Sequence, residues 1–141
     1  MSILGLSKYK IDERLSEIDY GKLDGKTLDF LQMHYPELSV AWGKKEDPNF
    51  PDGENTQSVF DRLNSFIESQ KKEPVKGNVL VCTHTVVLRC LIGDALGLPK
   101  SSWHTLVIPH LIPLECILTD DGKLFLNLEL AHLKQILQIP I

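Results

Sequence analysis

Residues Gly77–Leu98 read Gly-Asn-Val-Leu-Val-Cys-Thr-His-Thr-Val-Val-Leu-Arg-Cys-Leu-Ile-Gly-Asp-Ala-Leu-Gly-Leu, and the rest of the chain is interpreted around them. Its first part, Val79–Cys82, is apolar and β-branched, which is typical of a strand buried on both faces. From Val86 onward apolar residues recur at helical spacing, and Gly97 followed by a proline closes the predicted helix. The stretch therefore predicts a strand that passes directly into a helix.

Thr83, His84 and Thr85 occupy the point at which the predicted strand becomes the predicted helix. Free N–H groups at a helix start attract anions, and ligands bind at the carboxyl ends of strands in open α/β sheets. A protonated His84 would carry positive charge toward the same anion. Arg89, near the first turn, either adds a second cation or is simply solvated. For His84 the alternative is a local capping or packing role, and we favour the anion site.

The composition fits one domain with a real core, because 141 residues with 43% hydrophobic and 24% charged side chains are ordinary for a globular protein. A net charge of -4 and no Lys/Arg run longer than two argue against nucleic-acid binding. Apolar runs are too short to span a membrane. Three cysteines without a Cys-x-x-Cys pair favour reduced thiols. We therefore expect a cytoplasmic protein with no metal and no cofactor.

The N-terminal third alternates loops and short elements. Tyr9–Leu15 is a candidate strand, and Glu17–Gly25 is a loop whose two glycines indicate special backbone conformations. Thr27 is a candidate N-cap for a short helix that runs through Tyr35. Pro36 is expected to end that helix.

A longer amphipathic helix follows a loop rich in proline and acidic residues over 44–56. One face of the predicted helix is apolar and consists of Val59, Phe60, Leu63, Phe66 and Ile67. The opposite face is expected to meet water, with Asp61, Arg62, Asn64, Glu68 and Lys71.

Two apolar runs near the C-terminus, Leu114–Thr119 and Lys123–Leu130, flank Asp120-Asp121-Gly122. An Asp-Gly pair between two such runs predicts a β-hairpin. The tail from Ala131 to Ile141 is either a helix or a loose segment.

Four segments together resemble the histidine phosphatase superfamily, which includes the phosphoglycerate mutases. Leu15–Gly25 resembles its Leu-x-Glu-x-x-x-Gly-x-x-(acid or Gln)-Gly signature, and Pro51–Asn55 its Pro-Gly-Gly-Glu-Ser segment. Val79–His84 resembles the strand that carries its second histidine. Ile108–Leu114 is similar to an Ile-Pro-x-x-x-Pro-Leu stretch of the mutases. The resemblance covers residues 12 to about 118.

The resemblance implies roles for individual residues. Glu17 matches the family's proton donor, and His84 matches its second, phosphate-binding histidine. A carboxylic acid can protonate a departing phosphoester oxygen, while cations and N–H groups stabilise the phosphoryl oxygens. Tyr20, which matches a substrate-side tyrosine of the mutases, is a predicted substrate-binding residue together with Thr85 and Arg89. Thr85 replaces the glycine that usually follows the second histidine.

One family feature is missing from the sequence. Members carry an N-terminal strand that ends in Arg-His-Gly, whose histidine takes the phosphoryl group, and no Arg-His-Gly occurs in these 141 residues. We expect a single domain over 1–141, a three-layer α/β/α fold with a mixed, mainly parallel sheet that resembles the C-terminal part of the family domain. The chain is then incomplete relative to the family, swapped with a second copy, or rebuilt locally beside Val79–Thr83.

Three functions remain open at this point. The first is a phosphatase or mutase-like enzyme whose first segment lies outside this chain or comes from another. The second is an inactive relative that binds a phosphorylated small molecule. The third is an interaction module that uses an exposed strand edge for pairing. Because a sheet that lacks a central strand has open edges, we also expect a homo-oligomer.

Overall fold

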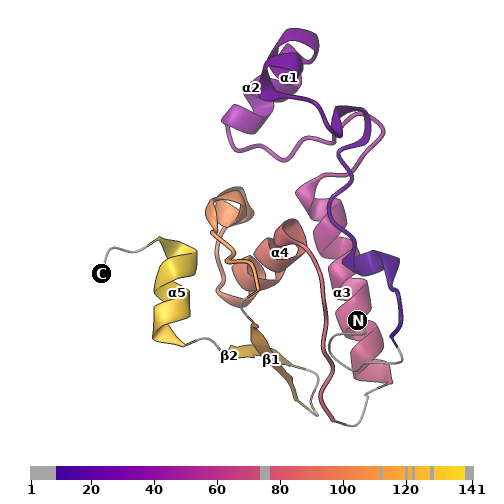
Figure 1. Ribbon diagram of the computed structural model, residues 1–141, viewed down its shortest axis with the longest axis vertical. Coiled ribbons are helices and arrows are strands. Elements are labelled where there is room, and N and C mark those ends of the chain that lie inside the picture. The colour runs from indigo at the N-terminus through magenta and orange to yellow at the C-terminus, as the bar shows by residue number, and fades with distance from the viewer. Residues whose placement is uncertain are drawn as a thin grey trace.

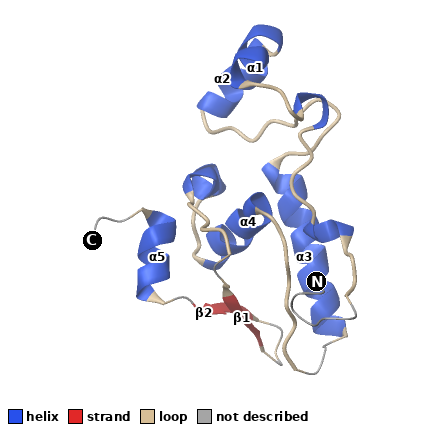
Figure 2. Ribbon diagram, viewed as in Figure 1, coloured by secondary structure: helices blue, strands red, loops and turns tan. Residues whose placement is uncertain are grey.

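The computed structural model describes residues 9–73, 77–111, 113–119, 121, 123–127 and 129–138. Helices dominate this part of the chain, and its two strands form one small antiparallel sheet (Figures 1 and 2). The helices and strands are α1 (Leu28–His34), α2 (Pro36–Gly43), α3 (Thr56–Lys72), α4 (Thr85–Ala95), β1 (Glu115–Leu118), β2 (Leu124–Asn127) and α5 (Leu130–Leu137). Short 3-10 turns cover Glu13–Leu15, Gly21–Leu23 and Lys100–Thr105.

Helices α1 and α2 lie together at one end of the molecule, at the top of Figure 1. The predicted cap is confirmed, because the Thr27 hydroxyl accepts a hydrogen bond from the Phe30 N–H at 3.2 Å. Pro36 does more than end α1: it is the first residue of α2, where its missing N–H costs nothing. Helix α2 was not expected from the sequence.

Helix α3 confirms the amphipathic pattern. The Asn55 side chain caps it by accepting from the Ser58 N–H at 2.9 Å. The Asp47 carboxylate accepts from the first two N–H groups of the helix at 2.8 and 2.9 Å, where a negative charge is favourable. The apolar stripe turns inward, so that Val59 and Leu63 are buried.

Helix α4 packs against α3, and the larger of two apolar clusters includes Val59 and Leu63 of α3 and Val87 and Cys90 of α4. On another side of α4, Gly93 lies against the Lys100–Thr105 turn, because a Cβ there would come within 2.3 Å of the Trp103 indole. Burial raises the pKa of the Cys90 thiol to about 12, so that this side chain stays protonated at neutral pH. A second cluster joins α4 to α5 through Ile92 and Ile136, both fully buried.

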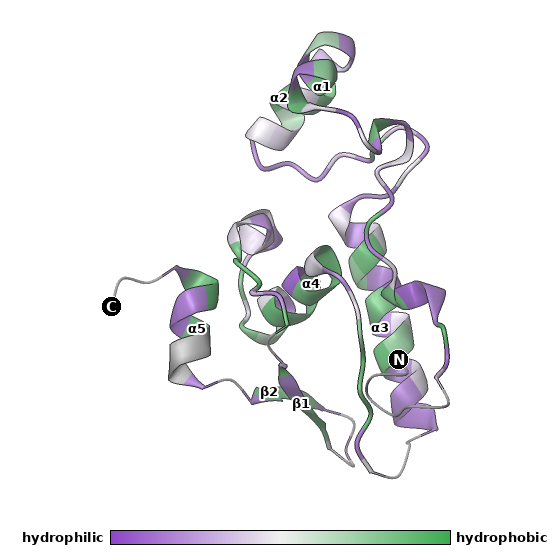
Figure 3. Cartoon of the chain, viewed as in Figure 1, coloured by the Kyte–Doolittle hydropathy of each residue, from purple (hydrophilic) through white to green (hydrophobic). Residues whose placement is uncertain are grey.

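The predicted buried strand at Val79–Cys82 is wrong. The segment has no strand partner in the described part of the chain, and Val79, Leu80 and Val81 are 55, 65 and 42% exposed. Figure 3 shows it as a hydrophobic run that leads up to α4. A strand forms only beside another strand that takes up its backbone hydrogen bonds, and none is described there. The mixed, mainly parallel sheet is therefore not confirmed.

The C-terminal hairpin is confirmed. Strand β1 pairs antiparallel with β2, and Cys116 faces Leu126 across the ladder. Two of the predicted turn residues, Asp120 and Gly122, lie outside the described residues. Of the two alternatives for the tail, the structure has the helix, because α5 extends as far as Leu137.

The candidate strand Tyr9–Leu15 instead contains the 3-10 turn Glu13–Leu15, which Asp12 caps by accepting from the Arg14 N–H at 3.1 Å. Among the described residues, no helix combines the length and the apolar character needed to cross a membrane.

Candidate active site

Two loops that are far apart in the sequence fit closely together beside the first turn of α3. Gly21 adopts a positive φ of 54°, and a Cβ on it would lie 2.2 Å from the Pro51 carbonyl oxygen. The Lys22 N–H donates to that same oxygen at 2.9 Å. A Cβ on Gly53 would lie 2.5 Å from the Asp19 carbonyl oxygen. Only glycine permits both approaches, so the resemblance segments 15–25 and 51–55 are one structural unit.

An ion pair lies beneath this unit. The Arg62 Nε is 2.9 Å from Glu54 Oε1, and the two side chains are only 17 and 25% exposed. The expectation that Arg62 meets water is therefore wrong. Burial disfavours the charged form of Glu54, but hydrogen bonds from Arg62 and the Asp19 N–H outweigh it and lower the pKa of the carboxyl.

The Glu17 side chain reaches the start of α4. Its Oε1 accepts a hydrogen bond from the Val86 N–H at 3.1 Å, and its Oε2 lies 3.5 Å from the same nitrogen. Nearby, the Thr83 hydroxyl donates to the Leu15 carbonyl at 2.7 Å. The loop that carries Glu17 and the segment that leads into α4 are therefore joined on both sides of His84.

His84 is the N-cap residue of α4, and its side chain makes no capping hydrogen bond. The capping role considered for it is therefore not seen, and its imidazole is exposed. Thr85 is the first residue of the helix. The structure thus brings Glu17, His84 and Thr85 to one place, the first turn of α4.

Tyr20 and Arg89 belong to the same neighbourhood electrostatically. Burial raises the pKa of the Tyr20 phenol; the Glu17 carboxylate raises it further, whereas Arg89 lowers it. The Tyr20 ring packs edge-on against Phe50, with 5.0 Å between ring centroids. Arg89 is not simply solvated, because its Nε donates to the Leu106 carbonyl at 2.9 Å.

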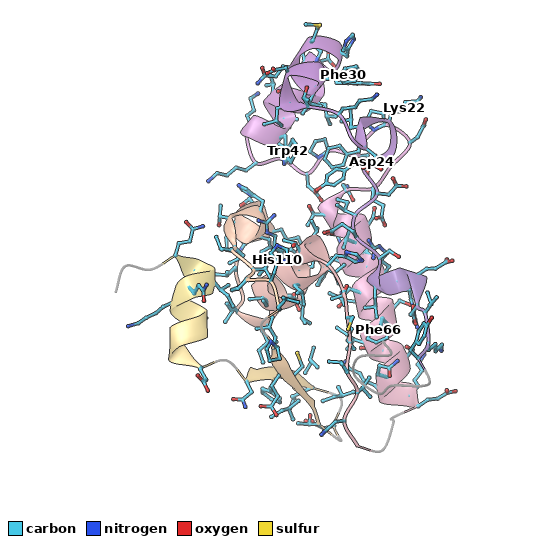
Figure 4. The ribbon with its side chains drawn as sticks, in the orientation of Figure 1. Lys22, Asp24, Phe30, Trp42, Phe66 and His110 are labelled. Carbon is cyan, nitrogen blue, oxygen red and sulfur yellow. The ribbon has the colours of Figure 1, made fainter. Side chains whose placement is uncertain are left out.

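Aromatic side chains continue from the site into the end of the molecule that holds α1 and α2. The Trp42 ring packs edge-on against Phe50 at 5.6 Å between centroids. Figure 4 shows Trp42 and Phe30 on these helices, with Lys22 on the loop beside them and His110 well away from them. Ring contacts from Tyr20 through Phe50 to Trp42 therefore connect the Glu17 loop to α2.

Two other features lie outside the site. A groove of about 390 Å³ runs between α3, α4 and β2, and its lining includes Leu63, Leu91 and Phe125 but none of the predicted site residues. Within the described ranges, no three His, Cys, Asp or Glu side chains gather closely enough to hold a metal ion.

Comparisons with known proteins identify the family of the chain. The family model of the histidine phosphatase superfamily (branch 1) matches residues 3–129. The chain is 32% identical over 95 residues to phosphoserine phosphatase 1 of Hydrogenobacter thermophilus, covering 65% of this chain and 44% of that one. It is also 32% identical over 93 residues to the probable phosphoglycerate mutase GpmB of Escherichia coli O1:K1 / APEC, covering 62% of this chain and 41% of that one.

A solved structure is similar as well. Bacillus stearothermophilus YhfR superposes with a TM-score of 0.64 at 25% identity, and the match covers 84% of this chain and 59% of that chain. The chain therefore belongs to the histidine phosphatase superfamily. It spans less than half the length of the two curated relatives named above.

Proposed function

We propose that this chain binds phosphate monoesters of small molecules at the first turn of α4, with Glu17 as the proton donor. The observation that carries the proposal is the contact of the Glu17 carboxylate with the Val86 N–H. A phosphate held by the helix start and by a protonated His84 would lie against this carboxyl. The names of the relatives, a phosphatase and a mutase of phosphorylated compounds, support the same substrate class.

The chemical step follows from the position of the acid. When the bond between phosphorus and the ester oxygen breaks, the departing alkoxide needs a proton, and the Glu17 carboxyl supplies it. As this bond breaks, the phosphorus forms a new bond to an imidazole nitrogen in the covalent route, and we propose that this imidazole is supplied from outside these 141 residues. Because the 141 residues contain no Arg-His-Gly, we propose that these residues bind the ester but do not form phosphohistidine by themselves.

Calorimetric titration tests the binding site. Inorganic phosphate is titrated into the wild-type chain and into two variants, His84→Ala and His34→Ala. The second variant is the control, because the wild-type His34 imidazole packs on Phe30 in α1, away from the proposed site. Sulfate is titrated in parallel because its charge stays constant near neutral pH. Sulfate affinity should fall as the pH rises through the range in which imidazoles lose their proton. The His84 variant should lose this dependence, and the His34 variant should keep it.

Two results would contradict the proposal. One is an unchanged affinity and pH dependence in His84→Ala, which would put the anion elsewhere. The other is a phosphohistidine trapped on this chain by acid-labile label from a phosphate monoester, because it would mean that the chain carries its own nucleophile.

A second candidate function is pairing with another copy of this chain. The observation that favours it is the exposed run at Val79–Val81. Unpaired extended segments recruit strands, and Asn78–Cys82 contains no charged side chain. Two copies can therefore pair about a two-fold axis without like charges facing each other.

Sedimentation velocity tests this second candidate. The wild-type chain should sediment as a dimer, and Leu80→Lys should sediment as a monomer with unchanged helix content. Ile11→Lys is the control, since Ile11 is 79% exposed but lies outside the segment. A monomeric wild-type chain, or a dimer that Leu80→Lys leaves intact, would contradict the pairing.

A further inference from the structure

The Arg62 guanidinium connects three separate pieces of chain. Its Nε and Nη2 donate to the two oxygens of the Glu54 carboxylate at 2.9 and 3.1 Å. Its Nη1 donates to the Arg14 carbonyl at 2.8 Å, and its Nη2 also donates to the Glu17 carbonyl at 3.1 Å. One planar side chain of α3 therefore binds the backbone at two points, at Arg14 within the 3-10 turn and at Glu17, the candidate acid itself.

The carboxylate of Glu54 extends these contacts to the next part of the loop. Its Oε2 accepts from the Asp19 N–H at 3.0 Å, and the Glu54 N–H donates to the Asp19 carbonyl at 2.8 Å. Ile18, between the two tethered residues, is buried. The backbone from Glu17 to Asp19 is thus fixed from α3 and from the 51–55 loop.

The carboxyl group of Glu17 has far fewer contacts of its own. Its hydrogen bonds come from the Val86 N–H and from the adjacent Ile18 N–H, at 3.1 and 3.0 Å. A side chain with two free torsions beyond Cβ keeps its place only when its backbone is held. The position of the Glu17 carboxyl therefore depends mainly on the contacts that fix the backbone of its loop.

From this geometry we infer that Arg62, acting with Glu54, is the positioning residue that holds the Glu17 carboxyl against the first turn of α4. The inference rests on the proposed function, in which Glu17 is the acid. A lysine cannot replace the fork, because an ammonium group is a single point of attachment and cannot bind a carboxylate and two carbonyls in fixed directions. Small displacements of a catalytic group cost large factors in rate.

The test follows the Val86 amide by ¹⁵N NMR while the pH is lowered. In the wild-type chain this amide should shift as Glu17 takes up its proton, and Glu17→Gln should abolish the shift. Arg62→Lys should lose most of the shift although helix content is retained. Arg14→Lys is the matched control, because Arg14 also pairs with a carboxylate, that of Asp12, and donates to the Ser65 carbonyl; its Val86 shift should be that of the wild type.

A second variant keeps the inference open to refutation if Arg62→Lys does not fold. Glu54→Gln preserves the size of the side chain but removes its charge, and it should reduce the Val86 shift to a smaller extent. A full wild-type shift in Arg62→Lys, or in Glu54→Gln when the lysine variant is unfolded, would overturn the inference. Phosphate affinity is measured on the same samples: a wild-type chain that binds no phosphate but shows the Arg62-dependent shift contradicts the proposed function and leaves the positioning intact.

Discussion

Two segments meet at the first turn of α4, the loop that carries Glu17 and the segment Val79–Cys82, and they differ in how many contacts hold them. The loop that carries Glu17 is polar and rich in glycine, yet side chains and backbone groups of two other segments fix it. The segment Val79–Cys82 is apolar and β-branched, yet its side chains are exposed. Local composition therefore does not decide which segment is held by contacts and which is exposed. A segment is ordered by the partners that satisfy its backbone groups.

Among substitutions that compare these two segments, the largest loss of stability should come from adding a methyl group to the tethered loop. Gly21→Ala places a Cβ 2.2 Å from the Pro51 carbonyl oxygen at a positive φ. Strain and steric conflict together should lower the free energy of unfolding by about 2–4 kcal/mol, measured by urea denaturation. Gly25→Ala is the control, since its φ is also positive but no atom lies within 4 Å, and it should cost about 1 kcal/mol. Equal costs would mean that the two loops do not meet.

The next largest effect is the loss of stability at low pH. The pKa of Glu54 is lowered in the folded chain, so this carboxylate contributes stability above its unfolded pKa of about 4.3. That contribution is lost as the pH falls through the lower, folded pKa. Glu54→Gln should cost about 1 kcal/mol at neutral pH and should lose less stability than the wild type on acidification. Parallel stability curves for the two proteins between neutral pH and pH 3 would refute the ion pair's role.

The smallest effect should come from the exposed segment. Leu80 is 65% exposed, so Leu80→Ala should change the free energy of unfolding by less than about 0.5 kcal/mol, measured at a concentration at which the chain is monomeric. Leu63→Ala, at a position only 4% exposed, should cost about 2–5 kcal/mol by comparison. A loss at Leu80 as large as that at Leu63 would show that the segment is buried in solution.

Local signals in the sequence were sufficient for much of the helical structure. Thr27 before a helix and the Asp-Gly pair between two apolar runs act through neighbouring residues, and both predictions are confirmed. The buried strand at Val79–Cys82 was predicted by the same reasoning, and that prediction is wrong. A buried strand depends on partner strands elsewhere in the chain, which its own residues do not specify.

The candidate site was predictable in part. Glu17 was predicted from motif resemblance and His84 also from its place before a helix, and the structure brings Glu17 to the first turn of the helix that follows His84. Arg62 was missed because a polar residue on an amphipathic helix was assigned to water. Its spacing did contain a signal: Arg62 follows Val59 by three and precedes Phe66 by four, so it lies within the apolar stripe. A charged residue in that position needs a buried partner, and Glu54 is that partner.

The most direct test of the central claim is a titration of the chain with inorganic phosphate, followed residue by residue in ¹H–¹⁵N spectra. We expect the amide shifts to concentrate at 83–87 and 17–21, where the start of α4 meets the tethered loop. We also expect them to weaken in His84→Ala, and we expect the amides of α5 not to move. Shifts confined to other parts of the chain, or shifts that His84→Ala leaves unchanged, would contradict it.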